Sequence, residues 1–182
     1  MLNKLKTKLS SLGARLKPGL RPLPPGEKLM SPDIALATWL GAGRLKPGSG
    51  TFGTLAALPV GYLIQYVTGI IGLAIAAAVL MWFGTKAATA YGKKSGEVDD
   101  QAIVVDEAVG LWIAALPAEG DVTLWLYAFL FFRLFDIVKP WPASYFEKRK
   151  KGGLDVMMDD VIAGLYAFLA VASFAASHLI SQ

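Results

Sequence analysis

The chain has 182 residues, of which 54% are hydrophobic and 18% are charged, so it is more apolar than an average soluble domain. The absence of cysteine from the sequence excludes disulfides and a cysteine nucleophile. The formal charge of +4 suits an anionic partner, but no helix-turn-helix or aromatic stacking pattern accompanies it. We therefore expect anionic membrane lipids, and not nucleic acid, as partners.

Residues 1–30 form a basic N-terminal arm. Its leucines are spaced three or four residues apart and would line one face of an amphipathic helix, followed by a proline-rich stretch. A disordered arm is the alternative. We assign residues 31–182 to one helical domain, because no second apolar core begins within them.

The first apolar segment runs from Pro47 to Thr85 without a charged side chain, about twice the ~20 residues that cross a bilayer as a helix. Thr68 and Gly69 mark a turn between its two arms. The glycine-rich stretch 41–54 opens the first arm, where backbone N–H groups can hold an anion. An ordinary loop is the alternative, since the stretch lacks the P-loop pattern.

Three apolar segments follow. The segment that starts at Ile103 and residues 122–138 predict a helical hairpin, and residues 159–182 predict a last helix. This layout puts every block of Lys and Arg at one end of an all-α membrane-associated bundle, and the positive-inside rule makes that end cytoplasmic. The Ile103 segment is short for a membrane span, so a shallowly inserted bundle is an alternative.

Carboxylates gather at the same end of the predicted helices. Mg²⁺ prefers oxygen ligands from a few carboxylates, water and substrate phosphate. Asp159 and Asp160 could instead cap the last helix, whereas we expect no such role for Asp106 and Glu107. The candidate metal ligands are Asp99, Asp106, Glu107, Asp136, Asp159 and Asp160.

Cations accompany the carboxylates. Arg133, Asp136 and Lys139 are three residues apart and can share one helical face. They form either an internal salt-bridge ladder or a site in which Arg133 and Lys139 bind phosphate oxygens, and both can hold together. The loop around Thr51 is a weaker third candidate for phosphate binding.

Three segments together resemble motifs of the phosphatidylglycerophosphatase A family, in the same order: IVVDEAVGLW, FRLFDIVKPWP and GGLDVMMDDVIAG. The resemblance covers about residues 33–175. It implies an all-helical fold, Mg²⁺ dependence and a place in the synthesis of phosphatidylglycerol and cardiolipin. Asp155 departs from an expected glycine, and Ser49-Gly50-Thr51 replaces a more usual Pro-Gly-Thr.

We therefore expect a Mg²⁺-dependent phosphatase that removes the terminal phosphate of phosphatidylglycerophosphate at the cytoplasmic face of a bacterial inner membrane. The alternatives are a phosphatase for another lipid or a soluble phosphomonoester, and a non-enzymatic ion pathway. The candidate catalytic residues are Asp106, Glu107 and Asp136, and the candidate phosphate-binding residues are Arg133, Lys139 and Thr51.

Overall fold

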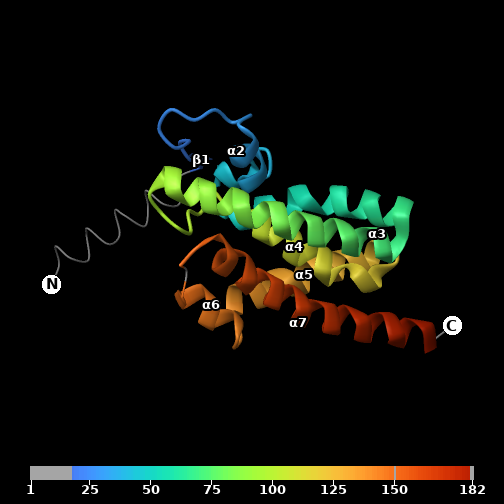
Figure 1. Ribbon diagram of the computed structural model, residues 1–182. Coiled ribbons are helices and arrows are strands. Elements are labelled where there is room, and N and C mark those ends of the chain that lie inside the picture. Colours follow the sequence, from blue (N-terminus) through green and yellow to red (C-terminus); the bar gives the residue numbers. More distant parts are fainter. Residues whose placement is uncertain (1–17, 150, 181–182) are drawn as a thin grey trace.

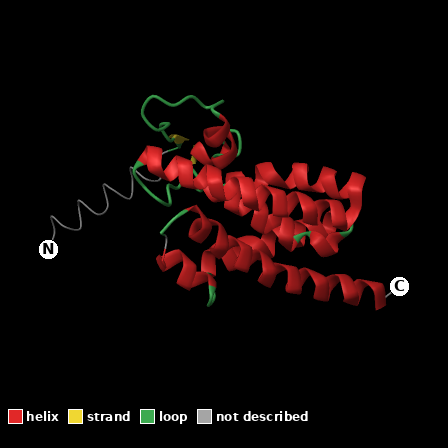
Figure 2. Cartoon of the chain, in the orientation of Figure 1, coloured by secondary structure: helices red, strands yellow, loops and turns green. Residues whose placement is uncertain are grey.

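The computed structural model describes residues 18–149 and 151–180 (Figure 1). Helices dominate this part of the chain, and its strands are two-residue pieces (Figure 2). This confirms the expected all-α fold. In chain order the elements are β1 (Gly19–Leu20), α2 (Pro32–Ala37), the 3-10 helix η1 (Ala42–Arg44), β2 (Leu45–Lys46), α3 (Ser49–Ser95), α4 (Val105–Ala114), the 3-10 helix η2 (Leu116–Ala118), α5 (Val122–Val138), α6 (Ala143–Arg149) and α7 (Gly153–Ile180).

Helix α3 is a hairpin of two arms. Gly69 interrupts the helix with φ 70° and ψ −170°, a left-handed φ that glycine adopts without the steric cost of a Cβ. Gly53 on the first arm packs against Val104, and Gly84 on the second arm packs against Val105, which follows Val104 in the chain. The two arms therefore lie against the same short segment. The chain therefore reverses at Gly69, as the sequence predicts.

Helix α4 lies at the centre of the bundle, in contact with α3, α5 and α7. It begins at Val105, two residues after Ile103, and has 10 residues, about 15 Å of helix. Protein covers its apolar side chains, including Val109 and Leu111. A short apolar run of this kind belongs to a core helix and not to a membrane span, so the possibility that this segment crosses the bilayer is wrong.

Helix α7 begins at Gly153, six residues before Asp159. Asp159 and Asp160 therefore lie in the second turn and cannot cap the helix, which corrects the capping alternative. The acidic residue in the first turn of α7 is Asp155, whose Oδ2 accepts a hydrogen bond from the backbone N–H of Lys151 at 2.8 Å. The two acids are thus free of a capping role.

Residues 18–30 pack against the helical domain. Strand β1 pairs antiparallel with β2, and Lys94 forms ion pairs with Glu27 at 3.0 Å and Asp33 at 2.6 Å. The amphipathic helix expected in the N-terminal arm falls on residues 1–17, outside the described residues.

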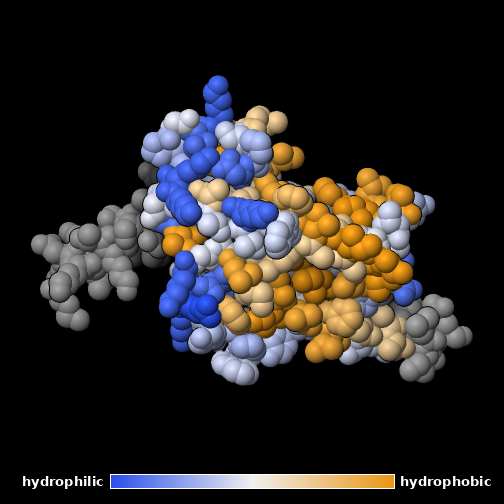
Figure 3. Space-filling view, in the orientation of Figure 1, coloured by the Kyte–Doolittle hydropathy of each residue, from blue (hydrophilic) through white to orange (hydrophobic). Residues whose placement is uncertain are grey.

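The surface of the bundle is divided along the helix axes. In Figure 3 hydrophilic residues gather at the end that carries β1 and α6, and hydrophobic residues cover most of the rest of this face. Helix α3 and the Gly153–Ser177 part of α7 are long and apolar enough to cross a membrane. On α3, the Lys86 ammonium lies 4.4 Å from the Trp82 ring centroid, an arrangement suited to a membrane–water interface.

Candidate active site

A polar pocket of about 190 Å³ opens at the hydrophilic end of the bundle. Its walls come from the first turn of α3, the loop before α4, the start of α4, the end of α5 and the second turn of α7. The lining residues are Ser49, Asp99, Asp100, Gln101, Ile103, Asp106, Glu107, Asp136, Lys139, Asp159 and Asp160.

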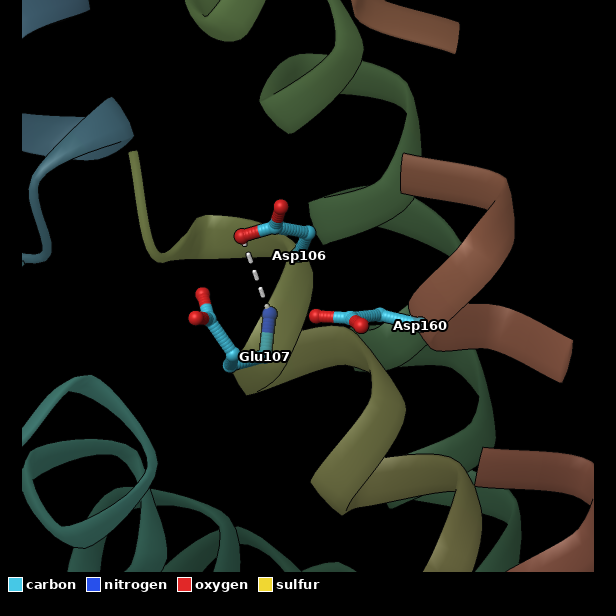
Figure 4. A group of neighbouring side chains, drawn as sticks. All are labelled: Asp106, Glu107 and Asp160. Atoms are coloured by element: carbon cyan, nitrogen blue, oxygen red, sulfur yellow. Dashed lines mark hydrogen bonds between the residues drawn. The ribbon is translucent and has the colours of Figure 1, made fainter. Parts of the chain in front are cut away.

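Three carboxylates form the centre of the pocket. Each of Asp106, Glu107 and Asp160 offers one oxygen atom, and these atoms lie within 4.8 Å of one another. Figure 4 shows Asp160, from α7, pointing toward the pair on α4. Asp106 Oδ1 also accepts a hydrogen bond from the Glu107 N–H at 3.1 Å.

The first turn of α4 holds two of these carboxylates. We expected no helix terminus to account for Asp106 and Glu107, and that expectation is wrong, because α4 begins at Val105. Negative charge is favourable at a helix N-terminus, typically by 0.3–1 kcal/mol. This effect is too small to offset the burial of three neighbouring carboxylates, so the cluster still needs a further explanation.

Glycines bring the acids of α4 and α7 together. A Cβ at Gly110 would lie 2.7 Å from the backbone oxygen of Asp160, and a Cβ at Gly164 would lie 3.0 Å from the Gly110 Cα. Only a missing side chain lets the two backbones approach so closely. The contact fixes Asp160 opposite the first turn of α4.

The acids on α4 have raised pKa values. Burial raises the pKa of the Asp106 carboxyl well above its usual value, and the charge of Glu107 adds to the shift. Burial also raises the pKa of Glu107 to about 8; a hydrogen bond with Asp106 opposes this shift and the charge of Asp160 adds to it. Proximity of like charges and burial both disfavour the ionised forms.

Two cations flank the carboxylates. Lys139 Nζ lies 2.8 Å from Asp159 Oδ2 and 4.0 Å from Asp136 Oδ1. Burial alone lowers the pKa of Lys139, but the carboxylate of Asp159 reverses this, so the net shift is upward. Arg133 pairs with Asp136, and the salt-bridge ladder expected on this face of α5 is therefore present.

Arg133 lies beside the pocket and does not line it. A Cβ on Gly50, in the first turn of α3, would lie 3.0 Å from Arg133 Nη1 and would collide with Glu107 Oε1. The start of α3 therefore contacts both a carboxylate of the cluster and a cation. The Arg133 Nε is buried and has no hydrogen-bond partner among the described residues.

The structure brings most predicted site residues to this pocket. Asp99, Asp136 and Asp159 line it outside the group of three carboxylates, while Thr51 is not among its lining residues. Sequence reasoning missed Ser49, Asp100 and Gln101. Asp100 and Gln101 adjoin the predicted acids, whereas nothing in the pattern of the 41–54 stretch distinguishes Ser49 from Thr51.

The carboxylate cluster fits a divalent cation. Glu107 Oε2 is buried without a hydrogen-bond partner among the described residues, and its neighbours Asp106 and Asp160 offer further oxygen atoms. Hard oxygen ligands are the donor set of Mg²⁺, which also retains water and binds substrate phosphate. The residues present therefore suit the metal that the sequence predicts.

Protein stripped of metal with EDTA should lose stability as pH rises. The pKa of Glu107 is about 8 in the folded state against an ordinary value of 4.5, so its proton binds the folded state more tightly. Protonation of Glu107 therefore contributes to the free energy of unfolding, and this contribution is full below pH 4.5. It amounts to a few kcal/mol, on the order expected for such a shift, and is lost as pH rises through the folded-state pKa. Thermal unfolding from about pH 5 to about pH 8.5 measures it.

Glu107→Gln provides the control for this pH dependence. The variant lacks the titrating group, so its unfolding temperature should fall less steeply over the same pH range. Equal slopes for the variant and the parent protein would show that Glu107 keeps an ordinary pKa.

Known proteins match the chain over most of its length. The model of the family described as Phosphatidylglycerophosphatase A matches residues 35–175. Phosphatidylglycerophosphatase A of Haemophilus influenzae is 35% identical over 145 residues, which cover 79% of this chain and 88% of that protein. The protein of the same name from Escherichia coli is 33% identical over 144 residues, with 76% and 80% covered.

A third relative carries a different name. The putative phosphatidylinositol-3-phosphatase of Bacteroides thetaiotaomicron is 38% identical over 146 residues, which cover 76% of this chain and 91% of that protein. No solved structure matches the chain.

The matched range includes every residue that lines the pocket, together with Arg133. The relatives are named as phosphatases, so a non-enzymatic ion pathway is excluded. A pocket of clustered carboxylates and flanking cations suits phosphate chemistry. The family match and the relatives agree with that chemistry, and the chain belongs to the phosphatidylglycerophosphatase A family of phosphatases.

Proposed function

We propose that the protein hydrolyses the terminal phosphate of phosphatidylglycerophosphate, giving phosphatidylglycerol and inorganic phosphate, in a Mg²⁺-dependent reaction. The phosphatidylglycerol would feed phospholipid and cardiolipin synthesis. The names of two relatives support this substrate. The observation that carries the proposal is the group of Asp106, Glu107 and Asp160 in a pocket that Lys139 also lines.

Asp106, Glu107 and Asp160 would hold Mg²⁺, with Asp99, Asp136 and Asp159 near enough in the pocket wall to orient bound water. When bound, the metal supplies Lewis-acid polarisation of the phosphoryl group and a lower pKa for water. Asp136 and Asp159 are themselves held by Arg133 and Lys139.

The other steps belong to the side chains. Lys139 binds a phosphate oxygen, and Arg133 adds positive charge beside the first turn of α3. Glu107 accepts a proton from the attacking water. The new bond forms between the water oxygen and phosphorus while the bond from phosphorus to the glycerol oxygen breaks, and that oxygen leaves with a proton drawn from solvent.

The place of the pocket along the bundle supports a substrate embedded in a membrane. Gly69, at the turn, follows Gly50 by 19 positions in the chain, about 28 Å of helix, close to the ~30 Å thickness of a bilayer's hydrocarbon core. With the Gly69 turn at the far boundary, the carboxylates lie at headgroup depth. By the positive-inside rule, the basic residues at the pocket end support an orientation in which that end faces the cytoplasm at a bacterial inner membrane, where they would attract anionic lipids.

Another lipid phosphate is the second candidate substrate. The name of the Bacteroides relative, at 38% identity, specifically favours a phosphoinositide. The same carboxylates and cations would serve that reaction, because they contact the phosphate and not the alcohol that leaves.

Phosphate release by purified protein with Mg²⁺ separates these substrates. Phosphatidylglycerophosphate, phosphatidylinositol 3-phosphate, phosphatidic acid and water-soluble glycerol 3-phosphate are compared in the same detergent. We expect the first to be hydrolysed with the highest kcat/KM. Faster release from the phosphoinositide would establish the second candidate, and equal release from glycerol 3-phosphate would contradict a lipid-specific enzyme.

A further inference from the structure

The side chain of Ser49 is a polar group that the proposed reaction leaves without a role. Ser49 lines the carboxylate pocket and is only 8% exposed. Its hydroxyl makes no hydrogen bond within the described part of the chain. The Ser49 oxygen is not among the buried side-chain atoms that lack a partner, so it opens onto the pocket, where a bound group can accept its hydrogen bond.

The backbone around Ser49 is arranged as an anion-binding turn. Gly48, with φ 83° and ψ 45°, is the N-cap residue and offers no capping side chain. The first N–H groups of a helix have no partners within the helix. They carry partial positive charge from the helix dipole, and in α3 no side chain of the N-cap residue competes for them.

The neighbours of this turn are those that a phosphate would contact. Gly50 touches both Glu107 and Arg133, since a Cβ there would meet each of them. The start of α3 therefore lies against both a carboxylate of the cluster and a guanidinium. An anion held at this turn would have both groups as neighbours.

We propose that the Ser49 hydroxyl, with the free N–H groups of the first turn of α3, donates hydrogen bonds to the phosphoryl group during hydrolysis. The inference rests on the proposed function and names a binding element of the same site. Ser49 replaces Thr51 in the role that the sequence suggested, because Ser49 and not Thr51 lines the pocket. The donors face the oxygens that gain negative charge as water attacks.

Binding of inorganic phosphate tests the inference independently of lipid hydrolysis. Isothermal titration of the Mg²⁺-loaded protein in detergent gives the Kd for phosphate. Ser49→Ala should weaken binding about 10-fold, the effect of losing one hydrogen bond to a charged group. Ser49→Thr keeps a hydroxyl and should recover part of the affinity.

Ser173→Ala is the matched control. Its hydroxyl donates to Leu169 O at 2.8 Å on an exposed part of α7, so phosphate binding should not change. Unchanged binding by Ser49→Ala, at an unfolding temperature equal to that of the parent protein, would overturn the inference. An equal loss in Thr51→Ala would overturn the assignment to Ser49.

The proposed function can fail separately. Suppose that Ser49→Ala loses phosphate affinity but the parent protein releases no phosphate from phosphatidylglycerophosphate. This result would support the anion-binding role of Ser49 and contradict the proposed substrate. If instead the parent protein releases phosphate normally and Ser49→Ala binds phosphate as tightly as the parent protein, the proposed substrate would be supported and the role of Ser49 contradicted.

Discussion

Asp106→Asn is expected to reduce kcat for phosphate release from phosphatidylglycerophosphate by at least about 10³-fold, because a metal ion contributes several kcal/mol to charge stabilisation. Asp106 is one of three residues whose oxygen atoms lie within 4.8 Å of one another. An amide at this position is a weaker ligand and removes one negative charge from the cluster. Rates with saturating Mg²⁺ measure the effect.

Stability separates loss of metal from loss of fold in this variant. Burial and the charge of Glu107 raise the pKa of Asp106, so removing its charge should leave the EDTA-treated protein as stable or more stable. Asp33→Asn alters an ion pair with Lys94, and neither residue lines the pocket, so this variant should keep full activity. Full activity in Asp106→Asn would remove this residue from the reaction.

Lys139→Gly is expected to lower kcat/KM by about 10²-fold, the usual cost of losing one donor to a developing oxyanion. Lys139 ends α5 in a left-handed conformation, with φ 47° and ψ 63°. Glycine adopts this conformation more readily than lysine does. The substitution therefore removes the ammonium group while the backbone gains a favourable residue.

The unfolding temperature of Lys139→Gly should stay close to that of the parent protein, since the backbone gain opposes the lost ion pair with Asp159. Lys94→Gly is not an equivalent control, because Lys94 lies inside a helix. Lys94→Met is the better one: it removes an ammonium that pairs with Glu27 and Asp33 and should not change kcat/KM. Unaltered kinetics in Lys139→Gly would show that Lys139 only balances Asp159.

Hydropathy and turn residues were enough to predict the long elements. The turn at Gly69 follows from a glycine within an uncharged apolar run, and helix 122–138 follows from an apolar segment that begins after turn residues. The same signals did not distinguish α4 from a membrane span, because a helix surrounded by protein and a helix surrounded by lipid are equally apolar. The length of the helix distinguishes the two cases, and α4, which begins only at Val105, has 10 residues.

The site shows where sequence patterns stop being informative. Adjacent acids, such as Asp159 and Asp160, are visible as interruptions of apolar segments. Their relation to Asp106 depends on the close contact of Gly110 with Gly164, which is a long-range property. The start of α7 at Gly153 likewise could not be located, since the residues before Asp159 carry no strong capping signal.

The choice between Ser49 and Thr51 is a matter of helical register. Both residues have a hydroxyl and both follow glycine. Two residues along a helix correspond to a rotation of about 200°, so only one of them can face the pocket. Packing of Gly50 and Gly53 against their neighbours determines which one does.

The position of a bound divalent cation tests the central claim most directly. Crystals grown with Mn²⁺, which accepts the same oxygen ligands as Mg²⁺, locate the ion by anomalous scattering. We expect a peak bounded by carboxylate oxygens of Asp106, Glu107 and Asp160, and its loss in Asp106→Asn. A peak at another place, or none among these three residues in active protein, would contradict a metal-dependent site in this pocket.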